Sequence, residues 1–485
     1  MAASDSPDKP PRDKTPPSNA DDRSPQAGAA PAERYRPLPT GIHGLDPELV
    51  KHDQRQRLQN AMIDLIAEKG YPAVRILDLA KLAHVSQPTF YSLYSDKEGL
   101  FLSAYEDISE RTARTIVDAY DVESSQDERL RVAMRAFAAL AASEPEAMSL
   151  LMLGGFGAGT RALERRRRAL DALETSIQAS RDRPRATRKA DLTVKAILGG
   201  VREVTATRLR EGRASELPLL VDELSAWASS YPPRLPPGLG APTVTGAPAG
   251  RSVPPASERA RRAEGPLPSG RTELPRQLIV KSQRERIVDA TAAIVAEKGL
   301  AGLTIPEIAR RASVSNQTFY SIYASKHDAF LGALKVGMHE ALRITGEAYG
   351  AHQDNWPRAV ADGLCALIDY LASEPAHAHL SLVDTFAASP EAIEIRSSAL
   401  QGFAAYLQPG YELACEGIEV PAIAAEAVTG GVWQVLHHYI ENGSIAQLPE
   451  AAAQVIYIAL TPFVGPKAAA RAARASARVG GAGSD

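Results

Sequence analysis

Two short runs of polar residues have the types and spacing that suit contact with a nucleic acid. Thr and Tyr hydroxyls and Lys ammonium groups bind phosphate oxygens, and the side-chain amides of Gln and Asn can pair with adenine. Each run follows a serine that can cap a short helix. The candidates are Ser86, Gln87, Pro88, Thr89, Tyr91, Ser92 and Lys97 in the first run, and Ser315, Asn316, Gln317, Thr318, Tyr320, Ser321 and Lys326 in the second.

The two runs belong to a long internal repeat. The segment that starts at Gln54 aligns without a gap to the segment that starts at Gln283, with about 20 identities over about 50 positions and an offset of 229. The match continues downstream, where Gly199-Gly200-Val201 corresponds to Gly430-Gly431-Val432 with an offset of 231. A whole unit of the 485-residue chain was therefore duplicated.

The elements before each run predict a scaffold of three helices. Apolar residues from Leu58 to Ile66 recur at helical spacing, and Gly70 and Gly299 suit a helix end. A second helix is expected near Ile76 and near Ile305, the latter with a Thr304/Glu307 capping box. A tight turn and a short third helix follow, which is the helix-turn-helix arrangement that places a recognition helix in the major groove.

A helix that ends in EKG, followed by IA-x-x-A-x-VS-x-x-TFY-x-x-Y-x-x-K with Leu79 in place of the isoleucine in the first copy, resembles the N-terminal domain of the TetR family of bacterial repressors. Both copies depart from it in the turn, where His84 and Ser313 replace a common glycine. The resemblance implies that Thr89, Tyr91, Lys97 and their counterparts Thr318, Tyr320, Lys326 contact phosphates. It implies that Gln87, Pro88, Ser92, Asn316, Gln317 and Ser321 face base edges. Phe90, Phe319, Tyr94 and Tyr323 are interpreted as core.

The chain is predicted to be all-α, with each helix-turn-helix domain followed by a helical bundle. Pro/Gly-rich composition indicates a linker between the copies and disorder at both ends. The expected order is a disordered arm at 1–45, a first helix-turn-helix domain at 46–103, a first regulatory domain at 104–231, a linker at 232–275, a second helix-turn-helix domain at 276–333, a second regulatory domain at 334–464 and a disordered basic tail at 465–485.

By the same resemblance, each regulatory domain would supply two helices to a four-helix interface, at 190–210 with 216–230 and at 421–441 with 449–464. Because one chain carries both copies, we expect them to pair as an intramolecular pseudo-dimer, since the linker gives an effective concentration of about the millimolar range. The third helices differ at Gln87-Pro88 and Asn316-Gln317. The expected partner is a double-stranded DNA operator with two unlike half-sites.

The resemblance also implies a small effector bound by the regulatory bundle. Residues that can line an apolar pocket with a few polar handles are also typical of an ordinary core, so the sequence leaves both readings open. The nominated pocket residues are Met152, Phe156, Phe386, Trp433 and His437.

Composition excludes few function classes. The net charge is −3, so any basic surface has to be local, as in the second copy, where basic residues exceed acidic ones. Two cysteines and an N-terminus without an apolar core favour the cytoplasm, with no membrane role expected. Four histidines, at 377, 379, 437 and 438, lack the spacing of a zinc site, so no metal or other cofactor and no catalytic residue is expected. An architectural DNA binder and a metal-dependent enzyme are the alternatives.

Overall fold

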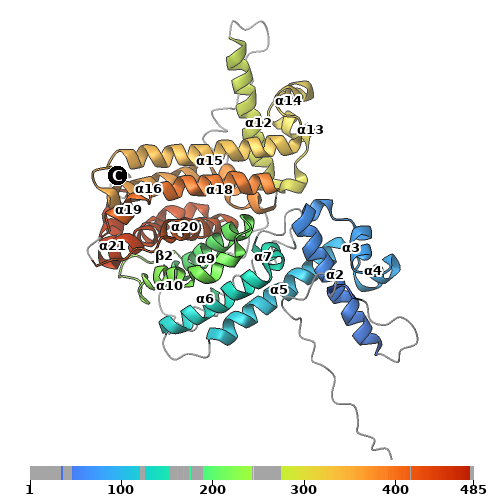
Figure 1. Ribbon diagram of the computed structural model, residues 1–485. Helices are drawn as coiled ribbons and strands as arrows, with labels where there is room; N and C mark the ends of the chain where they lie inside the picture. The colour runs from blue at the N-terminus through green and yellow to red at the C-terminus, as the bar shows by residue number, and fades with distance from the viewer. Residues whose placement is uncertain are drawn as a thin grey trace, which may run out of the picture.

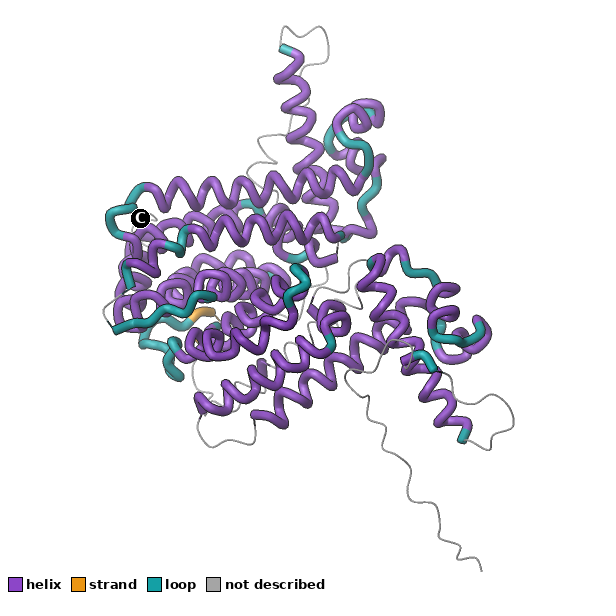
Figure 2. The backbone as a smooth tube through the Cα atoms, in the orientation of Figure 1, coloured by secondary structure: helices purple, strands orange, loops and turns teal. Residues whose placement is uncertain are grey.

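The computed structural model describes residues 34–36, 46–120, 126–152, 161, 168, 174–175, 189–242, 244, 275–387, 389–414 and 417–480. Within these residues the chain is helical apart from turns and one pair of two-residue strands, which confirms the all-α prediction (Figure 2). The strands β1 (Lys189–Ala190) and β2 (Ala241–Pro242) are antiparallel, and Lys189 is paired with Pro242.

The first copy is a helix-turn-helix domain joined to a bundle through one long helix. That helix, α5, crosses the boundary predicted at residue 103, so the two domains share a continuous element. The elements are α2 (Pro47–Lys69), η1 (Tyr71–Ala73), α3 (Ile76–Leu82), α4 (Gln87–Leu93), α5 (Lys97–Tyr120), α6 (Gln126–Ser143), α7 (Pro145–Met152), α9 (Thr193–Arg210), η2 (Ala214–Leu220) and α10 (Val221–Ser229).

The second copy repeats this order, and α15 is the counterpart of α5. The elements are α12 (Arg276–Lys298), η3 (Leu300–Gly302), α13 (Ile305–Arg311), α14 (Asn316–Ile322), α15 (Lys326–Gly350), α16 (Trp356–Ser373), α17 (Pro375–Leu382), η4 (Asp384–Ala387), α18 (Pro390–Ala405), α19 (Pro409–Glu412), α20 (Ala424–Glu441), η5 (Ile445–Gln447) and α21 (Leu448–Gly480).

The predicted apolar stripe of the first helix forms the core of each helix-turn-helix domain. Leu58 and Met62 of α2 are fully buried with Phe90 of α4, and Ile287 of α12 with Phe319 of α14. Burying one such side chain stabilises the fold by about 1.5–3 kcal/mol. The phenylalanines therefore hold the third helix against the first, as the sequence predicts.

The two regulatory bundles meet along α9 and α20, which lie side by side (Figure 1). Their backbones come unusually close where Gly199 faces Gly430. A Cβ on Gly430 would lie 2.3 Å from the Cβ of Glu203, and one on Gly199 would lie 2.9 Å from the carbonyl oxygen of Gly430. Only residues without a side chain allow this approach.

The boundaries predicted for the linker and for the disordered tail are wrong. Residues 232–242 pack against the bundles, with Leu239 and Ala241 buried. The helix α21 runs on past a kink at Gly465 and ends at Gly480, burying Ala469, Ala470 and Ala473, so 465–480 is not a disordered tail. Alanines at helical spacing bury a narrow face there, although their composition suggested a solvated segment.

One residue of the predicted disordered arm is packed against the first copy, and one apolar stretch near the C-terminus is long enough to be compared with a membrane span. In the N-terminal arm, Tyr35 is buried and its hydroxyl donates to Asp64 at 2.5 Å. One stretch, Ile445–Ser476, is long and apolar enough to cross a membrane, but 72% of its most apolar window is buried inside the protein. Burial of this kind is typical of a core helix.

Candidate nucleic-acid interface and apolar cavity

Each third helix starts at the serine that the sequence nominates. The Ser86 Oγ accepts a hydrogen bond from the Thr89 backbone N–H at 3.1 Å, and the Ser315 Oγ accepts from the Thr318 N–H at 3.0 Å. The predicted caps are confirmed. The capping box at Thr304 is wrong, because the Thr304 side chain makes no capping bond, and Glu307 instead pairs with Arg310 and Lys298.

The turn before each third helix has a left-handed residue at the position where the family pattern has glycine. His84 and Ser313 both have φ of 51°. An arginine from the first helix braces this turn: the Arg57 guanidinium donates to the carbonyls of Ala83 and His84, and Arg286 Nη1 donates to Ala312 O at 2.8 Å. This role could not be predicted from the sequence, because a single arginine on a polar helix face gives no signal of burial.

The side chains nominated to face DNA are largely exposed on both third helices. Tyr91 is 57% exposed and Tyr320 58%, whereas the neighbouring Phe90 and Phe319 are fully buried. Thr89 and Thr318 are half-buried. The exposed candidates are Ser86, Gln87, Pro88, Ser92, Ser315, Asn316, Gln317 and Ser321.

Internal hydrogen bonds restrict what some of these groups can do. The Ser92 Oγ donates to Thr89 O, and the Ser321 Oγ donates to Thr318 O, both at 2.7 Å. Each hydroxyl proton is therefore engaged within the helix. At the position of contact the serine oxygen can act only as an acceptor, for a donor such as an adenine or cytosine amino group.

The two lysines brace the loop before the second helix. Lys97 Nζ donates to Tyr71 O at 3.0 Å and to Val74 O at 2.9 Å, and burial lowers the pKa of this lysine. Lys326 Nζ donates to Leu303 O at 2.9 Å. Because an ammonium group has three donors, Lys97 retains one N–H and Lys326 two for a phosphate. The phosphate contacts of the two lysines stay predictions. Both lysines also have a structural role, because they hydrogen-bond to backbone carbonyls.

Ion pairs reduce the local basic excess of the second copy. Arg311 pairs with Glu297, and Arg310 and Lys298 pair with Glu307, whose pKa these two cations lower to about 2. Four other basic side chains of this domain lie on α12, and a fifth is Lys326. Those on α12 are Arg276, Lys281, Arg284 and Arg286, the last of which braces the turn.

A sequence model described as "Bacterial regulatory proteins, tetR family" matches residues 60–104 and again residues 287–332. Each match spans most of a helix-turn-helix domain as the structure shows it. Both helix-turn-helix domains therefore belong to the TetR family. The matched domain occurs twice in the chain, as the internal repeat predicts.

Three solved structures are similar to parts of this chain. The fatty acid degradation regulator FadR from Bacillus halodurans is 18% identical with a TM-score of 0.33, covering 36% of this chain and 94% of that chain. FadR from Bacillus subtilis, in complex with stearoyl-CoA, is 18% identical with a TM-score of 0.31, covering 36% and 96%. A TetR family transcription regulator from Marinobacter aquaeolei VT8 is 17% identical with a TM-score of 0.28, covering 37% and 96%. A comparison with curated protein sequences finds no match.

The helical bundle of the second copy contains an apolar cavity of about 830 Å³, counted with its opening to solvent. Helices α15, α16, α17, α18, α20 and α21 supply its walls. Aromatic residues make up much of the lining: Tyr349, Tyr370, Phe403, Tyr406 and Trp433.

The nominated pocket residues fall in different places. Trp433 lines the cavity, whereas His437, one turn further along α20, does not and instead has its Nδ1 3.5 Å from Glu441 Oε2. Met152 is buried in the first copy. Phe386 lies in η4, but its side chain is outside the described residues, as is the whole of Phe156.

Trp433 and His377, which line the cavity, each have a buried ring nitrogen without a hydrogen-bond partner among the described residues, Nε1 in Trp433 and Nδ1 in His377. His377 entered the sequence analysis only as a metal candidate. The described residues contain no group of three or more metal-binding side chains, and the histidines are separately engaged, His377 with Asp289 and His379 with Asp384. Burial and Lys195 lower the pKa of His438 to about 3.

Proposed function

We propose that this TetR family protein is a transcriptional repressor that grips DNA with both helix-turn-helix domains of one chain and releases it when an apolar effector binds. The observation that carries the proposal is that the third helices of the two copies, α4 and α14, have the same construction. Each begins at a serine cap and exposes a tyrosine hydroxyl above a buried phenylalanine. This arrangement suits phosphate contacts from Tyr91 and Tyr320 with base contacts from the exposed amides. Such a regulator needs no catalytic residue, and we assign it to the cytoplasm.

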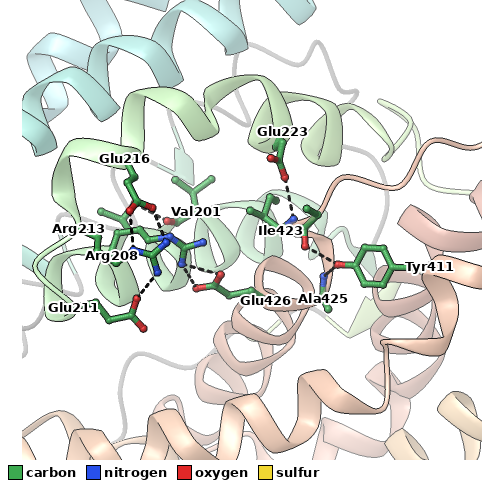
Figure 3. A network of polar contacts seen from close by, with 12 residues as sticks. Val201, Arg208, Glu211, Arg213, Glu216, Glu223, Tyr411, Ile423, Ala425 and Glu426 are labelled. Carbon is green, nitrogen blue, oxygen red and sulfur yellow. Dashed lines mark hydrogen bonds and ion pairs between the residues drawn. The ribbon is translucent and has the colours of Figure 1, made fainter.

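We infer that the two copies form an intramolecular pseudo-dimer. Contacts across α9 and α20 support this inference, including two hydrogen bonds of 3.0 Å from Arg208 Nη1 to the Glu426 carboxylate (Figure 3). Nearby, Glu223 accepts from the Ile423 backbone N–H at 3.1 Å. Tyr231 also donates to Ile458 O at 3.0 Å, so the pairing extends beyond the central helices.

The charges at this interface favour pairing between unlike copies. With the offset of 231, position 426 of the second copy corresponds to position 195 of the first, because 426 minus 231 is 195. Lys195 therefore stands where the second copy has Glu426. In a pair of first copies Arg208 would face Lys195, a like-charge contact, whereas in the single chain it faces a carboxylate.

The operator follows from the same asymmetry. The residues at the start of the third helices are Gln87-Pro88 in one copy and Asn316-Gln317 in the other. A proline has no side-chain amide to read a base, while glutamine can pair with adenine. We therefore propose two unlike half-sites, one for each recognition helix.

DNA binding is tested first by a mobility shift on the DNA upstream of the gene with the Tyr91→Phe, Tyr320→Phe double variant. Loss of two neutral hydrogen bonds to phosphates should weaken binding about tenfold or more and leave the slope of affinity against salt unchanged, because no cationic group is removed. Leu219→Ala is the control, because Leu219 is 78% exposed and lies in η2 of a regulatory domain. If the double variant binds as the parent does, the third helices are not the DNA contact.

The stoichiometry separates the pseudo-dimer from a dimer of chains. Sedimentation of the DNA complex should give one 51.8 kDa chain per operator. Sites selected from random DNA should return two unlike half-sites, and a perfect inverted repeat bound by two chains would contradict the inference.

The main alternative is an architectural DNA binder that ignores effectors. The apolar cavity beside α15 favours the inducible regulator, because α15 continues directly from the helix-turn-helix domain. Release of the mobility shift by apolar compounds would support induction. Binding that is indifferent both to sequence and to such compounds would favour the architectural role.

A further inference from the structure

One corner of the cavity is polar and is built around a glycine. A Cβ added to Gly337 of α15 would lie 2.9 Å from Ser381 Oγ and 3.5 Å from His377 Nδ1. Ser381 and His377 are both buried, at 5% and 3% exposure, and both line the cavity. A side chain at this position would collide with Ser381, so the glycine lets α15 lie close to two polar groups at the edge of an otherwise apolar space.

The hydrogen-bonding state of His377 is set from outside the cavity. Its Nε2 lies 3.2 Å from Asp289 Oδ1, and Asp289 belongs to α12, the first helix of the second helix-turn-helix domain. A carboxylate accepts hydrogen bonds, so Nε2 carries the proton in the neutral ring. Nδ1 is then an acceptor, and it has no partner among the described residues. Nδ1 can therefore accept a hydrogen bond from a ligand hydroxyl or from another donor.

The first copy fills the same corner with apolar residues. At the offset of 229, Ile108 stands at the place of Gly337 and Asn60 at that of Asp289. At the offset of 230 that aligns the Glu-Pro pairs at 144–145 and 374–375, Ala147 and Leu151 stand for His377 and Ser381. Ile108 and Ala147 are buried in the first-copy core. The glycine, the imidazole acceptor and the hydroxyl are thus all absent there.

We propose that effector sensing resides in the second copy alone, and that its effector is an apolar molecule carrying a hydroxyl group, an alcohol or a phenol. The hydroxyl donates to His377 Nδ1 beside Ser381, while the apolar body lies against the aromatic lining. This inference rests on the proposed regulator and names the chemistry and the copy that its effector uses.

Asp289 connects the effector-binding corner of the cavity to the DNA-binding domain. The ligand contacts His377 on α17, and His377 contacts the scaffold helix on which the third helix α14 is packed. Asp289 acts as a positioning residue, because it orients the ring without touching the ligand. Its effect should appear in the preference for a hydroxyl and in ligand-induced DNA release.

The test compares two probes of nearly equal size, 2-naphthol and 2-methylnaphthalene, titrated into the full chain. The readout is the ratio of their dissociation constants, which removes effects common to both. His377→Leu should change this ratio about tenfold against 2-naphthol, the loss of one hydrogen bond. Asp289→Asn should change it about threefold, since an amide N–H can reverse the proton positions on the ring. His379→Gln, on the same helix but outside the cavity lining, should leave the ratio unchanged.

Saturation at one 2-naphthol per chain is expected, and two per chain would overturn the assignment to one copy. An unchanged ratio in a folded His377→Leu protein would overturn the hydroxyl site. Should that variant not fold, Ser381→Ala must shift the ratio in the same direction. A parent chain that binds neither probe also overturns the inference. Mobility shift without probe is measured separately, so a failure to bind DNA would refute the proposed regulator and leave the ligand result standing.

Discussion

Arg396→Met should strongly destabilise the contact between the two copies. Arg396 lies in α18 of the second copy with 5% exposure, and its Nη2 is 2.6 Å from Oε2 of Glu203 on α9 of the first copy. Its guanidinium carbon also lies 4.7 Å from the centre of the Trp433 ring. Methionine retains the volume and removes both interactions.

The magnitude follows from the burial of Glu203, which is 7% exposed. Removing one partner of a buried ion pair costs about 3–5 kcal/mol, because the other charge stays in a poorly solvated place. That is a large part of a typical stability of about 5–15 kcal/mol. The double variant Arg396→Met, Glu203→Leu leaves no buried charge, so it should cost about 1 kcal/mol or less relative to the parent.

Urea unfolding followed by circular dichroism at pH 7 measures these differences. Arg343→Met is the matched control: Arg343 pairs with Glu340 and Glu347 at 2.7 and 2.6 Å, but its side chain is 43% exposed, so its loss should leave the stability nearly unchanged. A loss below about 1 kcal/mol for Arg396→Met would refute the reasoning. So would a double variant as unstable as the single one, since relief of the stranded carboxylate is the core of the argument.

Three further predictions concern the cap, a buried histidine and the glycine contact. Ser315→Ala should destabilise the protein by about 1 kcal/mol in thermal melts and weaken DNA binding, because α14 loses its cap. Burial and the nearby Lys195 lower the pKa of His438 from 6.5 to about 3, so only the unfolded state takes up its proton as pH falls through 6.5. Stability should therefore drop by about 1.4 kcal/mol between pH 7.5 and 5.5 on this account, and His438→Leu should remove that part of the slope in urea titrations. Gly430→Ala should separate the copies in sedimentation or proteolysis, because the new Cβ would lie 2.3 Å from the Cβ of Glu203, whereas Gly350→Ala meets nothing closer than 3.8 Å and should be neutral.

Local signals in the sequence were enough to predict the helix-turn-helix scaffold. The apolar spacing from Leu58 to Ile66, the glycine ends and the serine caps act within one or two turns of chain, so no tertiary information is needed. The expected core role of Phe90 and Phe319 holds for the same reason. The capping box failed because Glu307 had stronger partners, Arg310 and Lys298, than a backbone N–H.

Contacts between distant segments could not be predicted in this way. Arg57 braces a turn 26 residues away, and His377 meets Asp289 across 88 positions. Sequence spacing correctly placed Trp433 and His437 on one helix, but only Trp433 reaches the cavity. Nothing in the sequence alone distinguishes the two, since both lie one turn apart on a largely buried helix.

Covalent linkage of the copies changes what their shared interface can contain. In a symmetric dimer every substitution occurs twice, so Lys195 near Arg208 of a partner would be a repulsive contact made at two places. In one chain the facing residue is Glu426, and the same position carries opposite charges in the two copies. Loss of symmetry at the interface also removes the need for symmetry elsewhere. The third helices could then diverge toward unlike half-sites, and the first copy could fill its polar corner with Ile108 while the second kept Gly337. We therefore predict that Asn316→Gln with Gln317→Pro, which makes the two third helices alike at these positions, shifts the selected sites toward an inverted repeat and leaves the probe ratio as it was.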